Sequence, residues 1–143
     1  MHVRLHAIAR RVDPAAATAW WSDFRDGPHD HRFVPGSSRA VVERGAAHAT
    51  MVESVFGLTW EHVTAWPGDR HVRFVGTNKL SRFSGTYRFE PDPHGTRVVL
   101  EADIHLAGPL AWTDRAAKPM VQALLQADLR GHAKEMERDL APR

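Results

Sequence analysis

The chain has 143 residues, of which 43% are hydrophobic and 25% are charged, which is the size and composition of one ordinary globular domain. It contains no cysteine, and this excludes disulfides, thiolate metal sites, iron–sulfur clusters and cysteine nucleophiles. The formal net charge is +2 and the longest run of basic residues is Arg10-Arg11, so we expect no nucleic-acid partner. One domain is therefore expected over residues 1–143.

A strand and a helix are the first elements that the sequence predicts. The strand covers residues 2–12, and the helix begins at Asp13-Pro14, because Asp is a favoured N-cap residue and Pro is favoured at the first helical position. This helix contains Trp20-Trp21 and ends near residues 26–28. Residues 27–38 hold two pairs of Gly and Pro, which predicts a loop.

Between residues 38 and 106 the hydrophobic pattern has a period of two and is interrupted by turn residues. The interruptions are too short for the crossover that parallel strands need, so the pattern predicts an antiparallel meander. The predicted strands cover residues 38–44, 48–56, 58–66, 70–77, 80–90 and 96–106. In the last two strands one face carries Phe83, Gly85, Tyr87, Phe89, Val98, Leu100, Ala102, Ile104 and Leu106.

The strand over residues 58–66 has no clear inner face. Trp60 and His62 share one parity, whereas Glu61 and Val63 share the other. A buried Glu61 would need a partner for its carboxylate, so we favour Trp60 and His62 on the inner face. A bulge that changes the parity within the strand is the alternative.

A long helical segment follows Gly108-Pro109 and reaches Leu140. Pro119 either kinks this helix or begins a new helix after a short one over residues 110–118. At about 100° per residue, one broad apolar face is predicted. It consists of Met120, Val121, Leu124, Leu125, Ala127, Leu129, His132 and Met136.

These elements predict an α+β fold, in which a curved, seven-stranded antiparallel sheet wraps around the long C-terminal helix. A sheet with one apolar face must cover that face, and only the C-terminal helix is large enough to do so. A space lined by the inner strand faces and by the helix would remain between them.

Five motifs in this order carry a resemblance to a known family. They are Asp13-Pro14-Ala15 before Trp20-Trp21-Ser22-Asp23-Phe24, then Trp66-Pro67-Gly68-Asp69-Arg70, Phe83 to Pro91, Gly95 to Glu101, and Asp128 to Glu137. Nearly the whole chain resembles the helix-grip fold of the START-like (SRPBCC) superfamily, which includes polyketide cyclases/dehydrases and coenzyme-Q-binding proteins. The resemblance implies a cavity for a hydrophobic ligand, and it does not choose between binding and catalysis.

The candidate ligand-binding residues are inward-facing aromatic and apolar side chains. Ligand pockets are mostly apolar with a few polar groups, although the same residues could also fill an ordinary core. Tyr87 is the only tyrosine of the chain and brings a hydroxyl that needs a partner when buried. The set is Phe56, Trp60, Phe74, Phe83, Tyr87, Phe89, Met120 and Leu124.

If the protein is an enzyme, the candidate catalytic residues are His132, Asp128 and Tyr87. Asp128 and His132 are one helical turn apart, and a carboxylate at this spacing can orient an imidazole and raise its basicity, as in a general base. Alternatively, the two residues form an ordinary pair at the rim of the helix.

His29-Asp30-His31 has ligand types that suit zinc or iron. Two histidines in a loop, with no third one at helical spacing, are more typical of a solvated turn, so we expect no metal and no cofactor.

The sequence therefore leaves three functional hypotheses, of which the first is favoured: a binding protein for a lipid, quinone or polyketide-like aromatic. The second is a cyclase or dehydratase that uses general acid–base chemistry. The third is a protein-interaction module with exposed apolar residues around residues 27–38 and Trp112. The chain has no export signal and no stretch of the roughly 20 apolar residues that span a bilayer, so we expect a cytoplasmic protein. We expect it to be a monomer or a homodimer.

Overall fold

The computed structural model describes residues 1–23, 27–28, 38–55 and 59–142. For residues 27–28, 38–42, 53–55 and 59–61 it describes the backbone alone. The elements are β1 (His2–Arg10), α1 (Pro14–Ser22), β2 (Gly27–Pro28), β3 (Ser38–Arg44), β4 (Ala49–Val55), β5 (Thr59–Gly68), β6 (His71–Thr77), β7 (Ser81–Asp92), β8 (Gly95–Leu106), the 3-10 helix η1 (Gly108–Thr113) and α2 (Asp114–Leu140).

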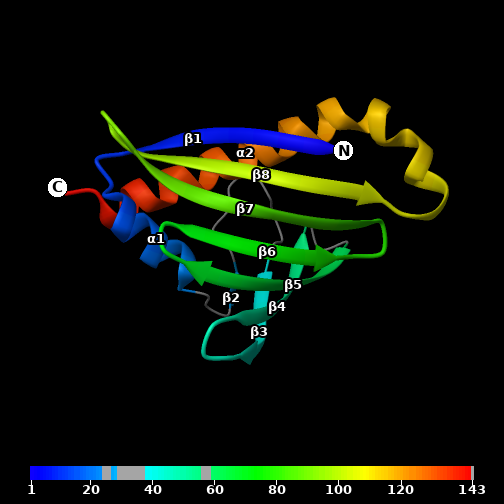
Figure 1. The fold of residues 1–143 in the computed structure, drawn as a ribbon, viewed down its shortest axis with the longest axis horizontal. Helices are drawn as coiled ribbons and strands as arrows, with labels where there is room; N and C mark the ends of the chain where they lie inside the picture. Colours follow the sequence, from blue (N-terminus) through cyan, green and yellow to red (C-terminus); the bar gives the residue numbers. More distant parts are fainter. Residues whose placement is uncertain (24–26, 29–37, 56–58, 143) are drawn as a thin grey trace.

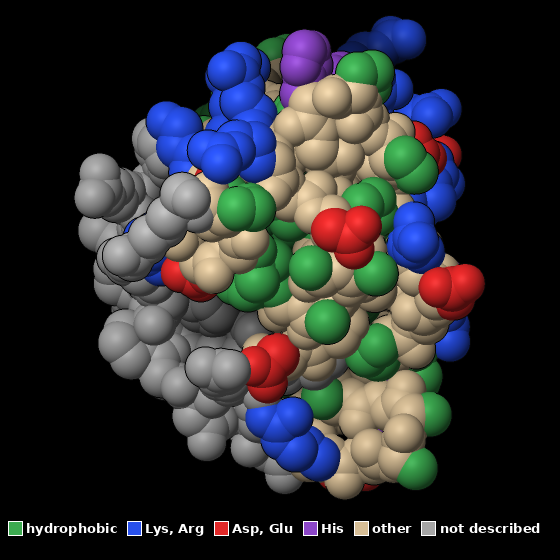
Figure 2. Space-filling model, turned by 90° about the vertical axis from the view of Figure 1, so that its left-hand side faces the viewer, with side chains coloured by type: hydrophobic (Ala, Val, Ile, Leu, Met, Phe, Trp, Pro, Cys, Tyr) green, Lys and Arg blue, Asp and Glu red, His purple; other side chains and the backbone are tan. Residues whose placement is uncertain are grey.

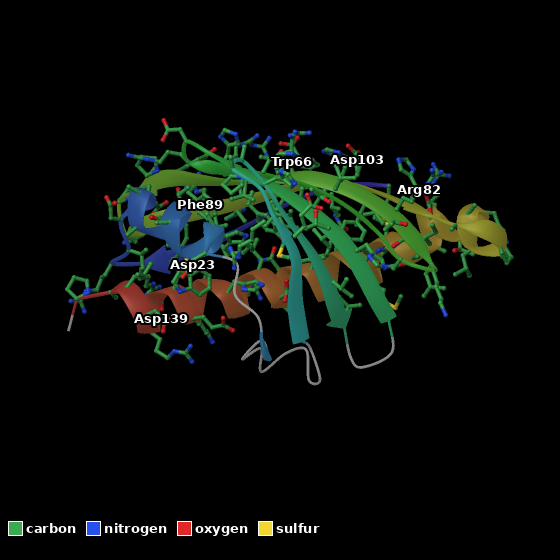
Figure 3. The ribbon with its side chains drawn as sticks, turned by 90° about the horizontal axis from the view of Figure 1, so that it is seen from below. Asp23, Trp66, Arg82, Phe89, Asp103 and Asp139 are labelled. Atoms are coloured by element: carbon green, nitrogen blue, oxygen red, sulfur yellow. The ribbon has the colours of Figure 1, made fainter. Side chains whose placement is uncertain are left out.

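The strands form one antiparallel sheet in the order β1-β8-β7-β6-β5-β4-β3-β2. The sheet curves over α2, which crosses its inner side, while α1 covers the same side at one end (Figure 1, Figure 3). The predicted helix-grip α+β fold with seven strands and a long C-terminal helix is confirmed, and the two-residue strand β2 is added at the edge beside β3. Pro119 lies inside α2, so it does not begin a new helix.

Side chains of α2 hold the helix along the free edge of β1. The Gln126 amide donates to the carbonyl of His6 at 2.9 Å. Eleven residues further along the helix, the Glu137 carboxylate accepts from the backbone N–H of Arg10 at 2.7 Å. An edge strand presents unpaired backbone groups, and here the helix that covers the inner face also satisfies some of them.

The apolar face of α2 is narrower than the pattern predicts. Leu129 is 1% exposed and packs in the core with Ala133 and Met136, whereas Met120 is 63% exposed and Leu124 is 50% exposed. Met120 precedes Leu129 by nine residues, which is about two and a half helical turns, so the two side chains leave opposite sides of the helix. The expectation that Met120 and Leu124 face the core is wrong.

The described side chains of β5 also differ from the interpretation that the sequence favours. Val63 and Ala65 are buried and pair with Gly76 and Phe74 of β6, while His62 is exposed. The inner parity is therefore that of Val63, and placing His62 on the inner face is wrong. The side chain of Trp60 lies outside the described residues.

Two phenylalanines cover two glycines at the centre of the inner face. Phe74 pairs with Gly85 and Gly76 pairs with Phe83 across the β6–β7 ladder. A Cβ on Gly76 would lie 2.2 Å from the ring of Phe83, and a Cβ on Gly85 would lie 2.8 Å from the ring of Phe74. The glycines thus let each ring lie flat on the neighbouring strand, an arrangement that pins the register of a sheet.

We expect Gly85→Ala to destabilise the fold by about 2 kcal/mol, because the added Cβ would also lie 2.4 Å from the carbonyl oxygen of Glu101, which cannot move without breaking the sheet. Gly45→Ala is the matched control, since its Cβ meets the imidazole of His48 at the same 2.4 Å and that side chain can turn away. Urea unfolding of both variants measures the difference, and equal losses would contradict the close packing described for Gly85.

Candidate functional site

The position of α1 is set by its N-terminal end. The Asp13 carboxylate caps the helix by accepting from the backbone N–H groups of Ala15 and Ala16, at 3.0 and 3.2 Å. Just before it, the carbonyl of Val12 accepts a buried hydrogen bond from the Thr96 hydroxyl at 2.7 Å. These contacts fix the start of α1 to the beginning of β8, and so determine where its tryptophans lie.

The β7–β8 turn beside this junction is tightened by Asp92. Its carboxylate accepts from the backbone N–H of His94 at 2.9 Å and from the guanidinium of Arg97 at 3.1 Å. The backbone hydrogen bond, followed by Arg97, lowers the pKa of the Asp92 carboxyl below its usual value. The carbonyl of His94 in turn accepts from the N–H of Arg11, so the turn also supports the chain leading into α1.

Trp20 and Trp21 connect α1 to the rest of the molecule. The indole N–H of Trp20 donates to the carboxylate of Asp139 near the end of α2, at 2.9 Å. The Trp21 ring lies against Tyr87 and Phe89 of β7, with centroid distances of 4.4 and 5.7 Å. Figure 3 shows Phe89 and Asp139 on the α2 side of the sheet, whereas Trp66, Arg82 and Asp103 lie on the other side.

A continuous series of ring contacts runs from the middle of the sheet to α2. The centroid distances are 6.2 Å from Phe83 to Phe74, 5.2 Å from Phe74 to Tyr87, 4.4 Å from Tyr87 to Trp21 and 4.7 Å from Trp21 to His132. We call these five residues the aromatic row. Its members come from β6, β7, α1 and α2, and their rings are tilted against one another by 34° to 55°.

His132 adds a polar group at the end of the aromatic row. Its Nε2 atom lies 3.4 Å from a carboxylate oxygen of Asp128, and the two side chains are 14% and 28% exposed. The predicted i,i+4 pair is therefore present and mostly shielded from water. A carboxylate in this position can fix the orientation of the imidazole, which can then accept or donate a proton beside the indole of Trp21.

The structure brings together most of the residues that the sequence singles out. Phe74, Phe83, Tyr87 and Phe89 lie on the inner face, and the first three belong to the aromatic row. His132 lies at the end of that row, but the indole of Trp21 stands between it and Tyr87. Met120 and Leu124 are exposed, Phe56 lies outside the described residues, and the side chain of Trp60 does as well.

Trp20 and Trp21 are the residues that sequence reasoning missed as part of the site. Trp21 follows Ala17 by four residues and so shares its face of α1, but that this face is the buried one is known only from the structure. The end of the molecule that carries α1 and the C-terminus is shown in Figure 2, where hydrophobic side chains are visible across the middle of the face. Both tryptophans are half-buried there, at the margin between core and surface.

No metal centre is present among the described side chains, where no three His, Asp or Glu residues gather around a common point. His29-Asp30-His31 lies outside the described residues. Within the described part of the chain, no helix combines the length and hydrophobicity needed to span a bilayer.

Comparison with protein families matched residues 6–137 to the model described as polyketide cyclase / dehydrase and lipid transport. No curated protein matched the chain. Among solved structures, TTHA0849 from Thermus thermophilus is similar, with a TM-score of 0.73, 21% identity, and coverage of 96% of this chain and 95% of that one.

Two further structures resemble the chain at low identity. The ZhuI aromatase/cyclase from Streptomyces sp. R1128 has a TM-score of 0.72 and 15% identity, and the match covers 96% of this chain and 94% of that one. A START superfamily protein from Mycobacterium smegmatis has a TM-score of 0.63 and 15% identity, with 97% and 96% covered. At these identities the likeness establishes the fold.

We expect Trp21→Ala to lower the free energy of unfolding by about 3 kcal/mol, because the indole packs on two rings of β7 and on His132. Trp112→Ala is the matched control, because Trp112 is 84% exposed and its removal should change stability by less than about 0.5 kcal/mol. Urea unfolding compares the two, and a loss in Trp112→Ala as large as in Trp21→Ala would contradict the packing role of Trp21.

Proposed function

Because the chain belongs to the polyketide cyclase/dehydrase and lipid transport family, we propose that it binds a small lipophilic molecule with aromatic rings between the sheet and α2. The observation that carries this proposal is the aromatic row, which offers ring surfaces from the centre of the sheet to His132. Planar ligands gain stacking energy on such surfaces, beyond the burial of their apolar area.

The ring character of the row favours an aromatic ligand over a purely aliphatic one. An acyl chain gains only from the burial of apolar area, and leucine or isoleucine side chains would serve it as well as rings do. Ring contacts add about 0.5–1.5 kcal/mol per pair for an aromatic partner. The similar structure named an aromatase/cyclase is consistent with this choice.

Isothermal titration calorimetry with 1,8-dihydroxyanthraquinone tests the binding proposal. We expect the wild type to bind, and Tyr87→Leu to bind about two- to tenfold more weakly, because the central ring of the row is lost. Trp66→Leu is the control: Trp66 lies on the outer face of the sheet, where the guanidinium of Arg73 stacks on it at 4.3 Å. Absence of binding by the wild type, or equal weakening in both variants, would contradict the proposal.

A second candidate function, a dehydratase, is favoured by the shielded pair of Asp128 and His132. In a bound β-hydroxy ketone, His132 would remove the proton next to the carbonyl while Asp128 holds the imidazole in place. The imidazolium of His132 then gives this proton to the hydroxyl group, which leaves as water as its C–O bond breaks, and a conjugated double bond remains. The base lies against the Trp21 ring, so a ring-containing substrate on the aromatic row would bring its reacting carbon near the imidazole.

An activity assay separates an enzyme from a binding protein. The substrate is a β-hydroxy ketone that carries a phenyl ring, and the loss of water is measured by the ultraviolet absorbance of the conjugated product. If the protein is a dehydratase, His132→Leu should lose about a hundredfold or more in rate, which is a much larger effect than the two- to tenfold weakening of anthraquinone binding expected when one ring of the aromatic row is removed. His105→Leu, at an exposed histidine of β8, should retain the rate. No acceleration by the wild type would leave binding alone as the function.

A further inference from the structure

The end of the molecule opposite α1 carries an exposed apolar surface. There η1 and the first turns of α2 project beyond the sheet, as both ribbon views show (Figure 1, Figure 3). Trp112 is 84% exposed, Met120 63%, Leu80 50% and Leu110 38%. Leu80 adjoins η1, because its carbonyl accepts from the N–H of Ala107 at 2.8 Å. Several large apolar side chains exposed at one end of a molecule are typical of an interaction site.

The same segments of the chain also carry basic side chains. We define the η1 tip as residues 79–82 together with residues 108–120. It contains Lys79, Arg82, Arg115 and Lys118. The only carboxylate in the same segments is that of Asp114, which lies 3.4 Å from the amino group of Met1. The tip therefore combines exposed apolar side chains with an excess of positive charge.

We propose that the η1 tip docks onto the surface of an anionic lipid bilayer. A tryptophan beside basic residues suits the membrane interface, where the indole sits at the headgroup level and Lys and Arg meet anionic headgroups. A bilayer also needs no shape complementarity, so a protruding end can reach it without a groove. This inference stands apart from ligand binding on the aromatic row and does not depend on it.

The charges select an anionic bilayer over a neutral one. Each Lys or Arg close to an anionic membrane contributes about 1 kcal/mol, which corresponds to about a fivefold change in affinity. This electrostatic part falls as salt is added, whereas the part due to Trp112 and its apolar neighbours persists.

Co-sedimentation with vesicles of equal parts phosphatidylcholine and phosphatidylglycerol tests the proposal, with pure phosphatidylcholine vesicles as the second membrane. We expect the wild type to bind the mixed vesicles, to bind the neutral ones much more weakly, and to lose affinity as salt is raised. Trp112→Ser should weaken binding at least about tenfold. Arg115→Gln and Lys118→Gln should weaken it about fivefold each.

Matched variants elsewhere on the fold control for general effects. Trp66→Ser removes a tryptophan from the outer face of the sheet, and Arg130→Gln with Lys134→Gln removes two exposed charges further along α2. None of these three substitutions should change the affinity for vesicles.

The proposal is overturned if the wild type does not bind the mixed vesicles, if it binds phosphatidylcholine vesicles equally well, or if Trp112→Ser binds the mixed vesicles as the wild type does. It is also overturned if analytical ultracentrifugation shows that the wild type self-associates and Trp112→Ser does not, since the tip would then be an interface between copies.

Discussion

The contact of the Trp21 ring with Tyr87 on one side and His132 on the other is the interaction on which the rest of the site depends. It joins α1, β7 and α2, three elements that are far apart in the sequence. Among the described ring contacts, His132 reaches the aromatic side chains of the sheet only through the two indoles of α1. The Asp13 cap and the Thr96 hydrogen bond therefore matter to the site, because they determine where α1 begins.

The sequence predicts the order of the elements well, because turn residues and hydrophobic period are local properties. The inner faces of β7 and β8 follow from the same reasoning, and Phe89, Val98 and Leu100 are all buried. The parity of β5 fails for a physical reason. Trp66 has the same parity as Trp60 and His62, and it lies on the outer side, where a guanidinium covers its ring, so aromatic residues at this parity carry no information about the core.

Contacts between distant segments explain the other differences. Met120 and Leu124 each precede a buried residue of α2 (Leu129 and Ala133) by nine residues, so they lie on the opposite side of the helix, and which side faces the sheet depends on packing that the periodicity does not specify. The pairing of Asp128 with His132 is predictable because it spans a single helical turn. The insertion of Trp21 between Tyr87 and His132 is not, since nothing in the local pattern of α1 specifies which strand and which helix its indole will meet.

The attachment of α2 to β1 has a mechanical consequence. Gln126 and Glu137 hold the helix to the edge strand at two points that are about 16 Å apart at 1.5 Å per residue, so the second half of α2 and β1 move as one body. In the described hydrogen bonds, nothing joins the span between Asp114 and Gln126 to β1. That span contains Pro119, which lacks a backbone donor. Asp114 holds the start of α2 to the amino group of Met1 and to the backbone N–H of Leu106, each at 3.4 Å, so bending of the helix is concentrated in the span between the attachments at Asp114 and Gln126.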